Sequence, residues 1–380
     1  FCRCLMAEMQ MRLENPAAAR AILRSGLAAG ESSWLRLGLG KACYLLGQYD
    51  DAIAHLHTAL RLRPLMIDAY RWLAAALLES NNPQEAIETL SRATEISPQS
   101  GMLHRQLAEM ALAQGDYLRA RDSTATMLDL NRFDHSKMIQ LLGSYIHCLI
   151  LYAMNSEDPY HIGNLKKQVN NALSRNRQQL MENGFDYATF EQVCQARVQV
   201  ARGEMVRGKK MLYKAIQPYQ HEPDNMTAPL LSNMVLGLTQ LGEYEYAEQL
   251  QKLMQGKENV DSLLLTCIQS NADDEGQQER QQKYRELNEQ GIKAYTQGRI
   301  EEALGCFREA LRRAPANTNA AINKAQALLQ LTKSHGKPQT ELLNECKGTL
   351  ALLDGVQLNP TQLERLRKLQ EDLQAQKSRP

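Results

Sequence analysis

The side chains that most often carry chemistry lie far apart along this sequence of 380 residues. His55 and His57 are two positions apart, so on a helix they face different directions and make a poor metal-binding pair. The carboxylate pair Glu301-Glu302 stands where a helix is expected to begin, and there it favours the positive end of the helix dipole. We find no phosphate-binding glycine loop, no Gly-x-Ser-x-Gly and no His-Glu-x-x-His. The sequence therefore predicts no catalytic, cofactor-binding or metal-binding residues and favours a protein that is not an enzyme.

Cysteine spacing, net charge and the longest apolar run indicate where the protein is located and which partners it does not bind. The eight cysteines have no Cys-x-x-Cys spacing, which is typical of reduced and mostly buried thiols and favours a cytoplasmic location. The net charge is +1, and we interpret the basic runs 165–177 and 205–214 as solvated helix faces, so we expect no nucleic-acid partner. The longest apolar run, 141–154, is too short to cross a bilayer, and we expect a buried helix and no membrane insertion.

Composition and length together predict a helical solenoid. Leu, Ala, Gln, Glu and Arg dominate, and all of them form helices well. A single globular core tends to split beyond roughly 250–300 residues. A solenoid avoids that limit, because each of its units packs only on its neighbours.

Turn-forming and small residues recur at intervals of 34 positions, so that residues 43–64 align with 77–98 and with 111–132. Gly47, Asn81 and Gly115 occupy the turn of each copy, where a left-handed conformation ends the first helix. Small residues five positions later allow the second helix to lie closely against the first, and proline ends the unit. The small and terminating positions are Ala52, Ala59, Pro64, Ala86, Ala93, Pro98 and Ala120. We therefore expect each unit to be a helical hairpin that cannot bury its faces alone.

Less regular copies extend this pattern through the rest of the chain. Residues 288–315 form a strong late copy, with Gly298, Ala303 and Pro315 in the turn, small and terminating positions. The expected organisation begins with an N-terminal block 1–134, made of a partial unit 1–32 and units 33–66, 67–100 and 101–134. A divergent helical region 135–270 follows, and then a polar stretch 271–283 that is expected to be a loop or linker or, alternatively, the exposed start of a helix. The chain continues with C-terminal repeats 284–353, which have a longer loop at Gly336-Lys337-Pro338, and with a capping helix 354–380.

The best copy resembles the tetratricopeptide repeat family in Leu39-Gly40, Gly47, Ala52, Ala59 and Pro64. This resemblance implies an all-α, right-handed solenoid whose first helices line a concave groove for a peptide or a partner helix. The groove positions that the resemblance implies are Trp34, Lys41, Tyr44, Arg71, Glu79, Arg105 and Glu109, and the same face includes Leu37, Asp68 and Met102. For Trp34, packing within its own hairpin is the alternative interpretation.

Residues 33–56 and 287–331 are also similar to bacterial response regulators that carry tetratricopeptide repeats after a receiver domain. This similarity implies the output module of a two-component signalling protein, with a receiver expected before Phe1. The partner is expected to be a protein or peptide of unknown identity. Association of two copies into a homodimer is an alternative that the sequence does not decide. The alternatives are an assembly or structural factor for a cell-envelope or surface apparatus and, third, an enzyme with its site in 135–230.

Overall fold

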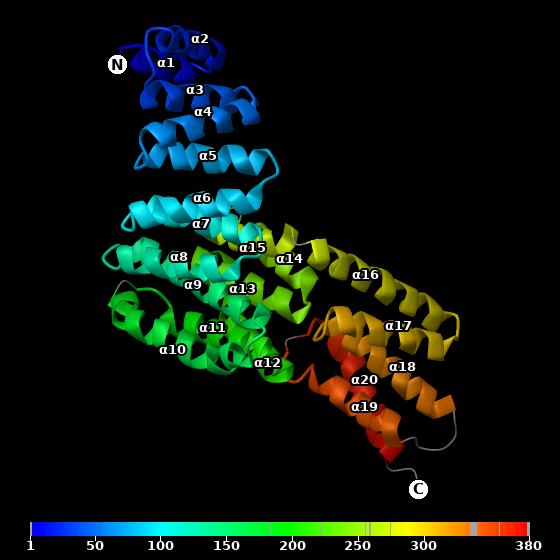
Figure 1. The fold of residues 1–380 in the computed structure, drawn as a ribbon. Helices are drawn as coiled ribbons and strands as arrows, with labels where there is room; N and C mark the ends of the chain where they lie inside the picture. Colours follow the sequence, from blue (N-terminus) through cyan, green and yellow to red (C-terminus); the bar gives the residue numbers. More distant parts are fainter. Residues whose placement is uncertain are drawn as a thin grey trace. The chain divides into compact units, whose positions relative to one another are not determined.

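The computed structural model describes residues 2–182, 184–220, 222–254, 256–257, 260–273, 275–334, 340–356 and 358–377. Within these ranges every regular element is helical: twenty α-helices and two short 3-10 segments (Figure 1). The prediction of an all-α fold is therefore confirmed. The chain divides into two compact units, residues 1–130 (unit 1) and residues 131–380 (unit 2), so the division falls four residues before the predicted end of the N-terminal block.

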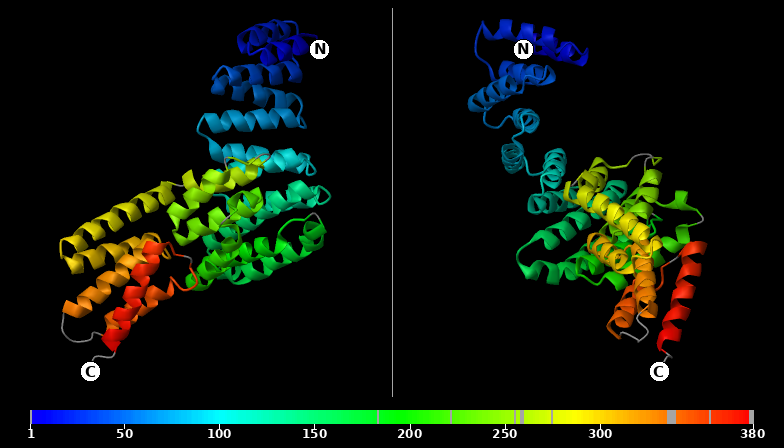
Figure 2. Two further views of the ribbon diagram at one scale, coloured as in Figure 1. Left: turned by 180° about the vertical axis from the view of Figure 1, so that it is seen from behind. Right: turned by 90° about the vertical axis from the view of Figure 1, so that its right-hand side faces the viewer.

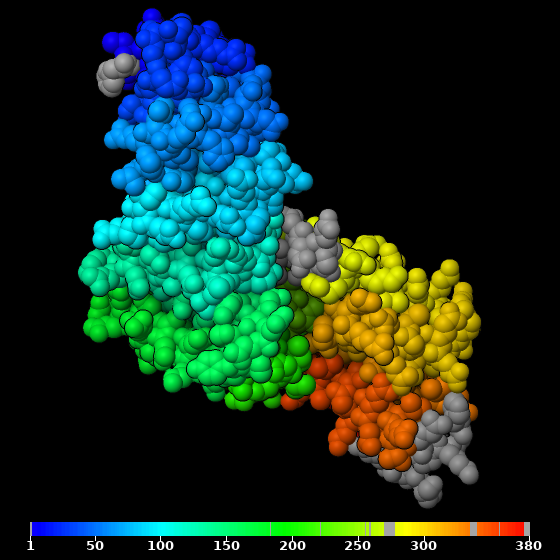
Figure 3. Space-filling view, in the orientation of Figure 1, coloured from blue at the N-terminus to red at the C-terminus, as the bar shows by residue number. Residues whose placement is uncertain are grey.

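Unit 1 is a stack of four helical hairpins, which follow one another in chain order (Figures 1 and 2). On the face shown in Figure 3, the side chains of successive hairpins meet without a break. The helices are α1 (Cys2–Arg12), α2 (Pro16–Leu27), α3 (Ser33–Leu45), α4 (Tyr49–Leu62), α5 (Ile67–Glu79), α6 (Pro83–Ile96), α7 (Gly101–Ala113) and α8 (Tyr117–Leu130).

Left-handed residues close the turns of these hairpins. Gly47, Asn81 and Gly115 have φ angles of 71°, 62° and 74°. Glu14 takes the same conformation in the first hairpin, with a φ of 57°. Because a left-handed residue directs the chain back on itself after the first helix, each second helix lies antiparallel to its first.

Small residues set the distance between the two helices of a hairpin. Ala52 and Ala86 are fully buried. Gly40 of α3 faces Leu56 of α4 so closely that a Cβ atom on Gly40 would lie 2.5 Å from the leucine Cγ. A larger side chain at any of these positions would hold the helices apart.

Leu37 corrects one expectation about the concave face. The sequence places Leu37 among residues that point into the groove, but its side chain is buried in the core of unit 1 with Ala69 and Leu73 of α5. The reason is that α3 and α5 lie directly against each other, so this position of a first helix is covered by the next first helix.

Unit 2 begins with longer helices. Its helices are α9 (His135–Asn155), α10 (Pro159–Glu182), α11 (Tyr187–Ala201), α12 (Met205–Ile216), α13 (Ala228–Leu241), α14 (Tyr244–Met254), α15 (Ser262–Asp273), α16 (Glu275–Thr296), α17 (Ile300–Arg313), α18 (Thr318–Ser334), α19 (Thr340–Ala351) and α20 (Pro360–Lys377), with 3-10 segments η1 (Gln217–Tyr219) and η2 (Pro223–Asn225). By length and composition alone α9, with 21 residues, is apolar enough to cross a membrane, but 61% of its most apolar window is buried within the fold. A core helix meets the same criterion.

A polar loop or linker at 271–283 is wrong, and the alternative, the start of a helix, describes residues 275–283. Residues 271–273 are the end of α15 and residues 275–283 are the start of α16. The stretch contains no proline, and its many Gln, Glu and Arg residues have high helix propensity, so polarity here accompanies a helix. The longer loop predicted at Gly336-Lys337-Pro338 lies outside the described residues.

The C-terminal helix has a well-formed start. The Asn359 side chain accepts a hydrogen bond from the Gln362 backbone N–H at 2.8 Å, and the Gln362 side chain accepts one from the Asn359 N–H at 3.1 Å. This reciprocal arrangement satisfies two N–H groups that the helix itself leaves unpaired. From there α20 packs along α18.

A buried polar network, here called the polar junction, joins three segments of unit 2. The Lys209 ammonium of α12 lies 2.7 Å from Glu243 Oε1, and both side chains are almost completely buried. The same carboxylate oxygen accepts hydrogen bonds from the backbone N–H and hydroxyl of Thr318, at the start of α18. Beside them the Asn317 amide donates to the Gly242 carbonyl at 2.8 Å. The run 205–214 is thus not simply a solvated face, because Lys209 is inside the fold and only neighbours such as Lys210 are exposed.

A second buried cation lies among α9, α11 and α13. The Arg197 guanidinium is completely buried and donates hydrogen bonds to His147 Nδ1 at 2.7 Å, to Asn233 Oδ1 and to Gln240 Oε1. Burial lowers the pKa of Arg197 to about 10, so the group remains a cation at neutral pH. Burial, and after it the charge of Arg197, hold the pKa of His147 well below its ordinary value. His147 is therefore neutral and acts as an acceptor.

We expect Ala52→Leu and Ala86→Leu each to lower the free energy of unfolding by about 1–3 kcal/mol, because each inserts a larger side chain between two packed helices. The measurement is chemical denaturation of each variant. Ala54→Leu, on the exposed side of α4, is the matched control and should change stability by less than about 0.5 kcal/mol. Unchanged melting of both core variants would contradict the 34-residue register.

We expect Lys209→Met to cost about 3–5 kcal/mol, because Glu243 would be left buried without its cation. The neighbouring Lys210→Met is the control: the Lys210 ammonium is exposed, 3.1 Å from Asp354 Oδ2, and its loss should cost less than about 1 kcal/mol. Replacing both partners, in Lys209→Met/Glu243→Leu, should restore much of the lost stability. Equal destabilisation by the two lysine substitutions would contradict the polar junction.

We expect unit 2 to lose stability as the pH falls below about 6.5, the ordinary histidine pKa. The pKa of His147 is lowered in the folded state, so below that pH the unfolded chain binds a proton that the folded chain does not. The resulting slope is at most about 1.4 kcal/mol per pH unit. His147→Gln should flatten the curve of unfolding free energy between pH 5 and 6.5 relative to the same substitution at the exposed His57. An unchanged slope in His147→Gln would show that His147 is not the group responsible.

Candidate partner-binding surface

The first helices of consecutive hairpins lie side by side in unit 1 and share one face. α1 contacts α3, and α3 contacts α5. The Lys41 ammonium of α3 lies 3.9 Å from Glu8 Oε2 of α1 and 5.7 Å from the centre of the Trp72 ring of α5. One lysine therefore connects three successive first helices through an ion pair and a cation–π contact.

Aromatic rings continue this face from α3 to α5. The Tyr44 ring lies 5.3 Å from the Trp72 ring in an edge-to-face arrangement and 5.7 Å from the Tyr49 ring. Burial raises the pKa of Tyr44, and the nearby Glu79 carboxylate raises it further. The hydroxyl is consequently protonated at neutral pH and can donate a hydrogen bond.

Arg71 extends the same face to α7. Its Nε donates to Gln106 Oε1 at 3.1 Å, and its Nη1 lies 3.5 Å from Asp68 Oδ1 one turn earlier. Arg105 and Glu109 are half-buried on α7, and both have interactions of their own. We call the set Glu8, Lys41, Tyr44, Arg71, Trp72 and Gln106 the first-helix strip.

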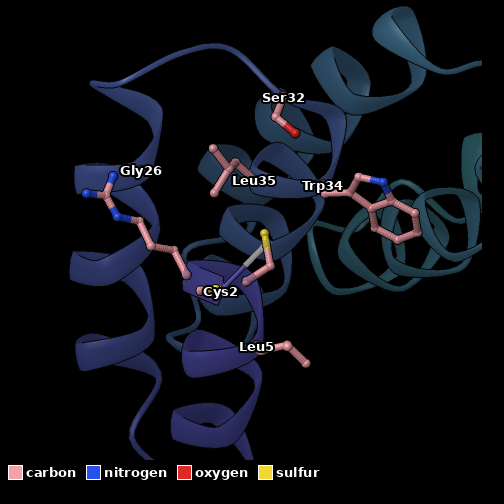
Figure 4. Close-up of a pocket in the computed structure, with 8 residues that line it drawn as sticks. Cys2, Leu5, Gly26, Ser32, Trp34 and Leu35 are labelled. Atoms are coloured by element: carbon pink, nitrogen blue, oxygen red, sulfur yellow. The ribbon is translucent and has the colours of Figure 1, made fainter.

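Trp34 lies apart from the strip. The Arg63 guanidinium stands 5.5 Å above its ring, within the same hairpin, yet 52% of the side chain is exposed. Trp34 also lines a largely apolar pocket of about 700 Å³, together with Cys2, Arg3, Cys4, Leu5, Gly26, Ser32 and Leu35 (Figure 4). Trp34 thus makes the packing contact with its own hairpin and is still half exposed.

The structure brings together only part of the predicted set. Lys41 and Tyr44 meet around Trp72, Arg71 lies on the same helix as Trp72, and Glu79 influences the Tyr44 hydroxyl. Glu109 and Arg105 are on the next first helix along.

Three members of the strip were not predicted: Trp72, Glu8 and Gln106. Trp72 has the clearest signal in the sequence, because it directly follows Arg71 and is one of only two tryptophans in the chain. The family pattern does not include it, because that pattern assigns the groove to fixed repeat positions and Trp72 lies one position beyond such a site. A long aromatic side chain reaches the shared face from there.

The chemistry of the strip suits recognition of a polypeptide. Its cations each have a carboxylate within 4 Å, Glu8 for Lys41 and Asp68 for Arg71, so the surface is close to neutral locally. Half-buried aromatic rings provide apolar area with a polar edge, which is the composition found at binding hot spots. In the part of the chain that the structure describes, no group of three or more His, Cys, Asp or Glu side chains could hold a metal ion.

Comparison with protein families identifies the repeats. A tetratricopeptide repeat model matches residues 44–110, and another tetratricopeptide repeat model matches residues 288–335. The first match covers α4 to α6 completely, and the second contains α17. The chain therefore contains tetratricopeptide repeats in both units, in an all-α fold of that type. No curated protein sequence matches the chain.

Solved structures that match the chain do so at low sequence identity and with TM-scores below 0.5. The crystal structure of MamA is 19% identical, covering 46% of this chain and 95% of that one, with a TM-score of 0.34. The Naa15/Naa10 structure bound to HypK-THB is 13% identical, covering 98% and 67%, with a TM-score of 0.45. The P58(IPK) TPR domain is 16% identical, covering 91% and 99%, with a TM-score of 0.25.

Proposed function

We propose that this tetratricopeptide-repeat chain is a non-catalytic scaffold that binds a protein partner on the first-helix strip. The observation that supports this most is the group of contacts around Trp72, where Tyr44 and Lys41 from α3 meet the indole ring on α5 and Lys41 also reaches Glu8 on α1. A partner that follows this face would touch several hairpins at once. The partner's chemistry is proposed as an extended peptide or a helix with apolar anchors and mixed charge.

A partner held mainly by a terminal carboxylate is a poor fit. Such a ligand needs cations whose charge is not already balanced, whereas Lys41 and Arg71 each have a carboxylate neighbour. In addition, Leu37, which the family resemblance places on the groove face, is apolar and buried in the core. We therefore favour binding through aromatic area and distributed hydrogen bonds.

The pathway and the location in the cell where the scaffold acts are a separate and more specific proposal. A cytoplasmic output module of a bacterial two-component protein, and an assembly factor for a cell-envelope apparatus, are both compatible with a binding face on the first helices. The first rests on the similarity of residues 33–56 and 287–331 to receiver-linked repeats, and it stays a prediction.

We expect the triple variant Lys41→Glu/Arg71→Glu/Arg105→Glu to lose at least about tenfold in partner recovery, because three charges on the binding face are reversed. The measurement is quantitative mass spectrometry of proteins retained by the immobilised chain. The matched control reverses three exposed arginines on second helices, Arg24, Arg61 and Arg92, with the same change in net charge. Equal recovery by both triple variants, with helical circular dichroism retained, would place the partner surface elsewhere.

A further inference from the structure

α1 and the residue directly after it expose a row of large apolar side chains, Leu5, Met6, Met9 and Leu13, here called the α1 face. Each of the four side chains is at least half exposed. Two of the three charged residues of α1, Arg3 and Glu8, are engaged elsewhere, with the Ser25 carbonyl at 2.8 Å and with Lys41 at 3.9 Å. The third, Arg12, is exposed in the last turn of the helix. The α1 face itself is made of uncharged side chains.

The later hairpins contain positions that are equivalent to those of the α1 face. Ala7 and Leu23 of the first hairpin take the places of Gly40 and Leu56, an offset of 33 residues. By that offset Met6, which is 55% exposed, corresponds to Leu39, and the next two repeats have Leu73 and Leu107 there. Those three leucines are 0%, 2% and 5% exposed. A position that is buried in three consecutive hairpins is open in the first.

Met9 follows the same rule in the next two hairpins. Leu5 follows it in the next hairpin only, because its later equivalents Trp72 and Gln106 lie half-buried on the first-helix strip. Met9, 63% exposed, corresponds to Ala42, which is completely buried. Leu5 corresponds to Gly38, and Gly38 lies so close to the preceding hairpin that a Cβ atom there would be 2.9 Å from Leu23 Cδ2.

The second helix of the preceding hairpin covers these positions in the later repeats. Leu39 and Ala42 of α3 pack with Leu23 of α2 in one apolar cluster. The same pairing of a second helix with the following first helix occurs between α4 and α5 and between α6 and α7. The interface has one recurring feature on the second helix, a leucine followed three residues later by a small residue. The instances are Leu23 and Gly26, Leu56 and Ala59, and Leu90 and Ala93.

We propose that the α1 face receives the second helix of one more hairpin of this repeat type, supplied by polypeptide outside residues 1–380. The occupant is a neutral amphipathic helix that presents a leucine and a small residue three positions later. The interface would continue the one already formed three times in unit 1. A second copy of this chain is a poorer occupant, because its helices α2, α4 and α6 are already covered by α3, α5 and α7. Its helix α8 has Thr124 and Met127 where the other second helices have the leucine and the small residue.

The test places a copy of residues 33–67 directly before residue 1 of the full chain, so that a known second helix arrives in register with α1. The readouts are the melting temperature and the rate at which maleimide labels Cys2, followed by peptide mass spectrometry. Cys2 is exposed, and its equivalent Ala69 is completely buried. We expect labelling of Cys2 to slow by about tenfold or more, because reaction then requires the added hairpin to undock, and we expect the melting temperature to rise.

The matched control carries the same extension on a chain with Met6→Glu and Met9→Glu, two exposed positions whose change leaves the hairpin core intact. There Cys2 should react as fast as in the unextended chain. An extension that folds by circular dichroism but leaves Cys2 labelling unchanged in the native chain would overturn the proposal. So would a dimer of residues 1–380 in sedimentation velocity that Met6→Glu/Met9→Glu converts to a monomer, because a second copy would then be the occupant.

Discussion

Close approach between the two helices of a hairpin is the constraint on which the rest of this structure depends. Gly40 allows it against Leu56 in unit 1, and Gly291 allows it against Phe307 in unit 2, where a Cβ atom would lie 2.5 Å from the ring. At such distances a side chain larger than hydrogen cannot be accommodated without displacing a helix. The first helices α1 and α3, and α3 and α5, are also in contact. The first-helix strip lies along the face that these helices share.

Unit 2 depends on buried polar contacts where the repeat is less regular. Lys209 and Glu243 join α12 to the turn before α14, and Thr318 connects the same carboxylate to α18. Gly242 beside them has a φ of 76°, and a Cβ atom there would lie 2.5 Å from the Ala314 Cα. Apolar packing tolerates small shifts in register, whereas a buried ion pair does not. We infer that these contacts determine which helices meet in the part of the chain where the 34-residue spacing is weak.

The sequence predicts helices and turns better than it predicts which side chains from distant parts of the chain contact one another. The spacing of Gly47, Asn81 and Gly115 was enough to expect hairpins, because a left-handed turn residue and a small residue five positions later are local requirements. The burial of Lys209 was not predictable in this way. Its run of basic residues looks solvated, and the partner Glu243 is distant in the chain. Trp72 was missed for a related reason, since its role comes from Lys41 and Tyr44 on another helix.

Site-specific photo-crosslinking tests most directly whether partners lie against the first helices of unit 1. A photoreactive amino acid would replace Glu79, exposed on the first helix α5, or Glu88, exposed on the second helix α6. After irradiation in cells, we expect a discrete crosslinked partner from position 79 and none from position 88. Crosslinking from position 88 with none from position 79 would contradict the account.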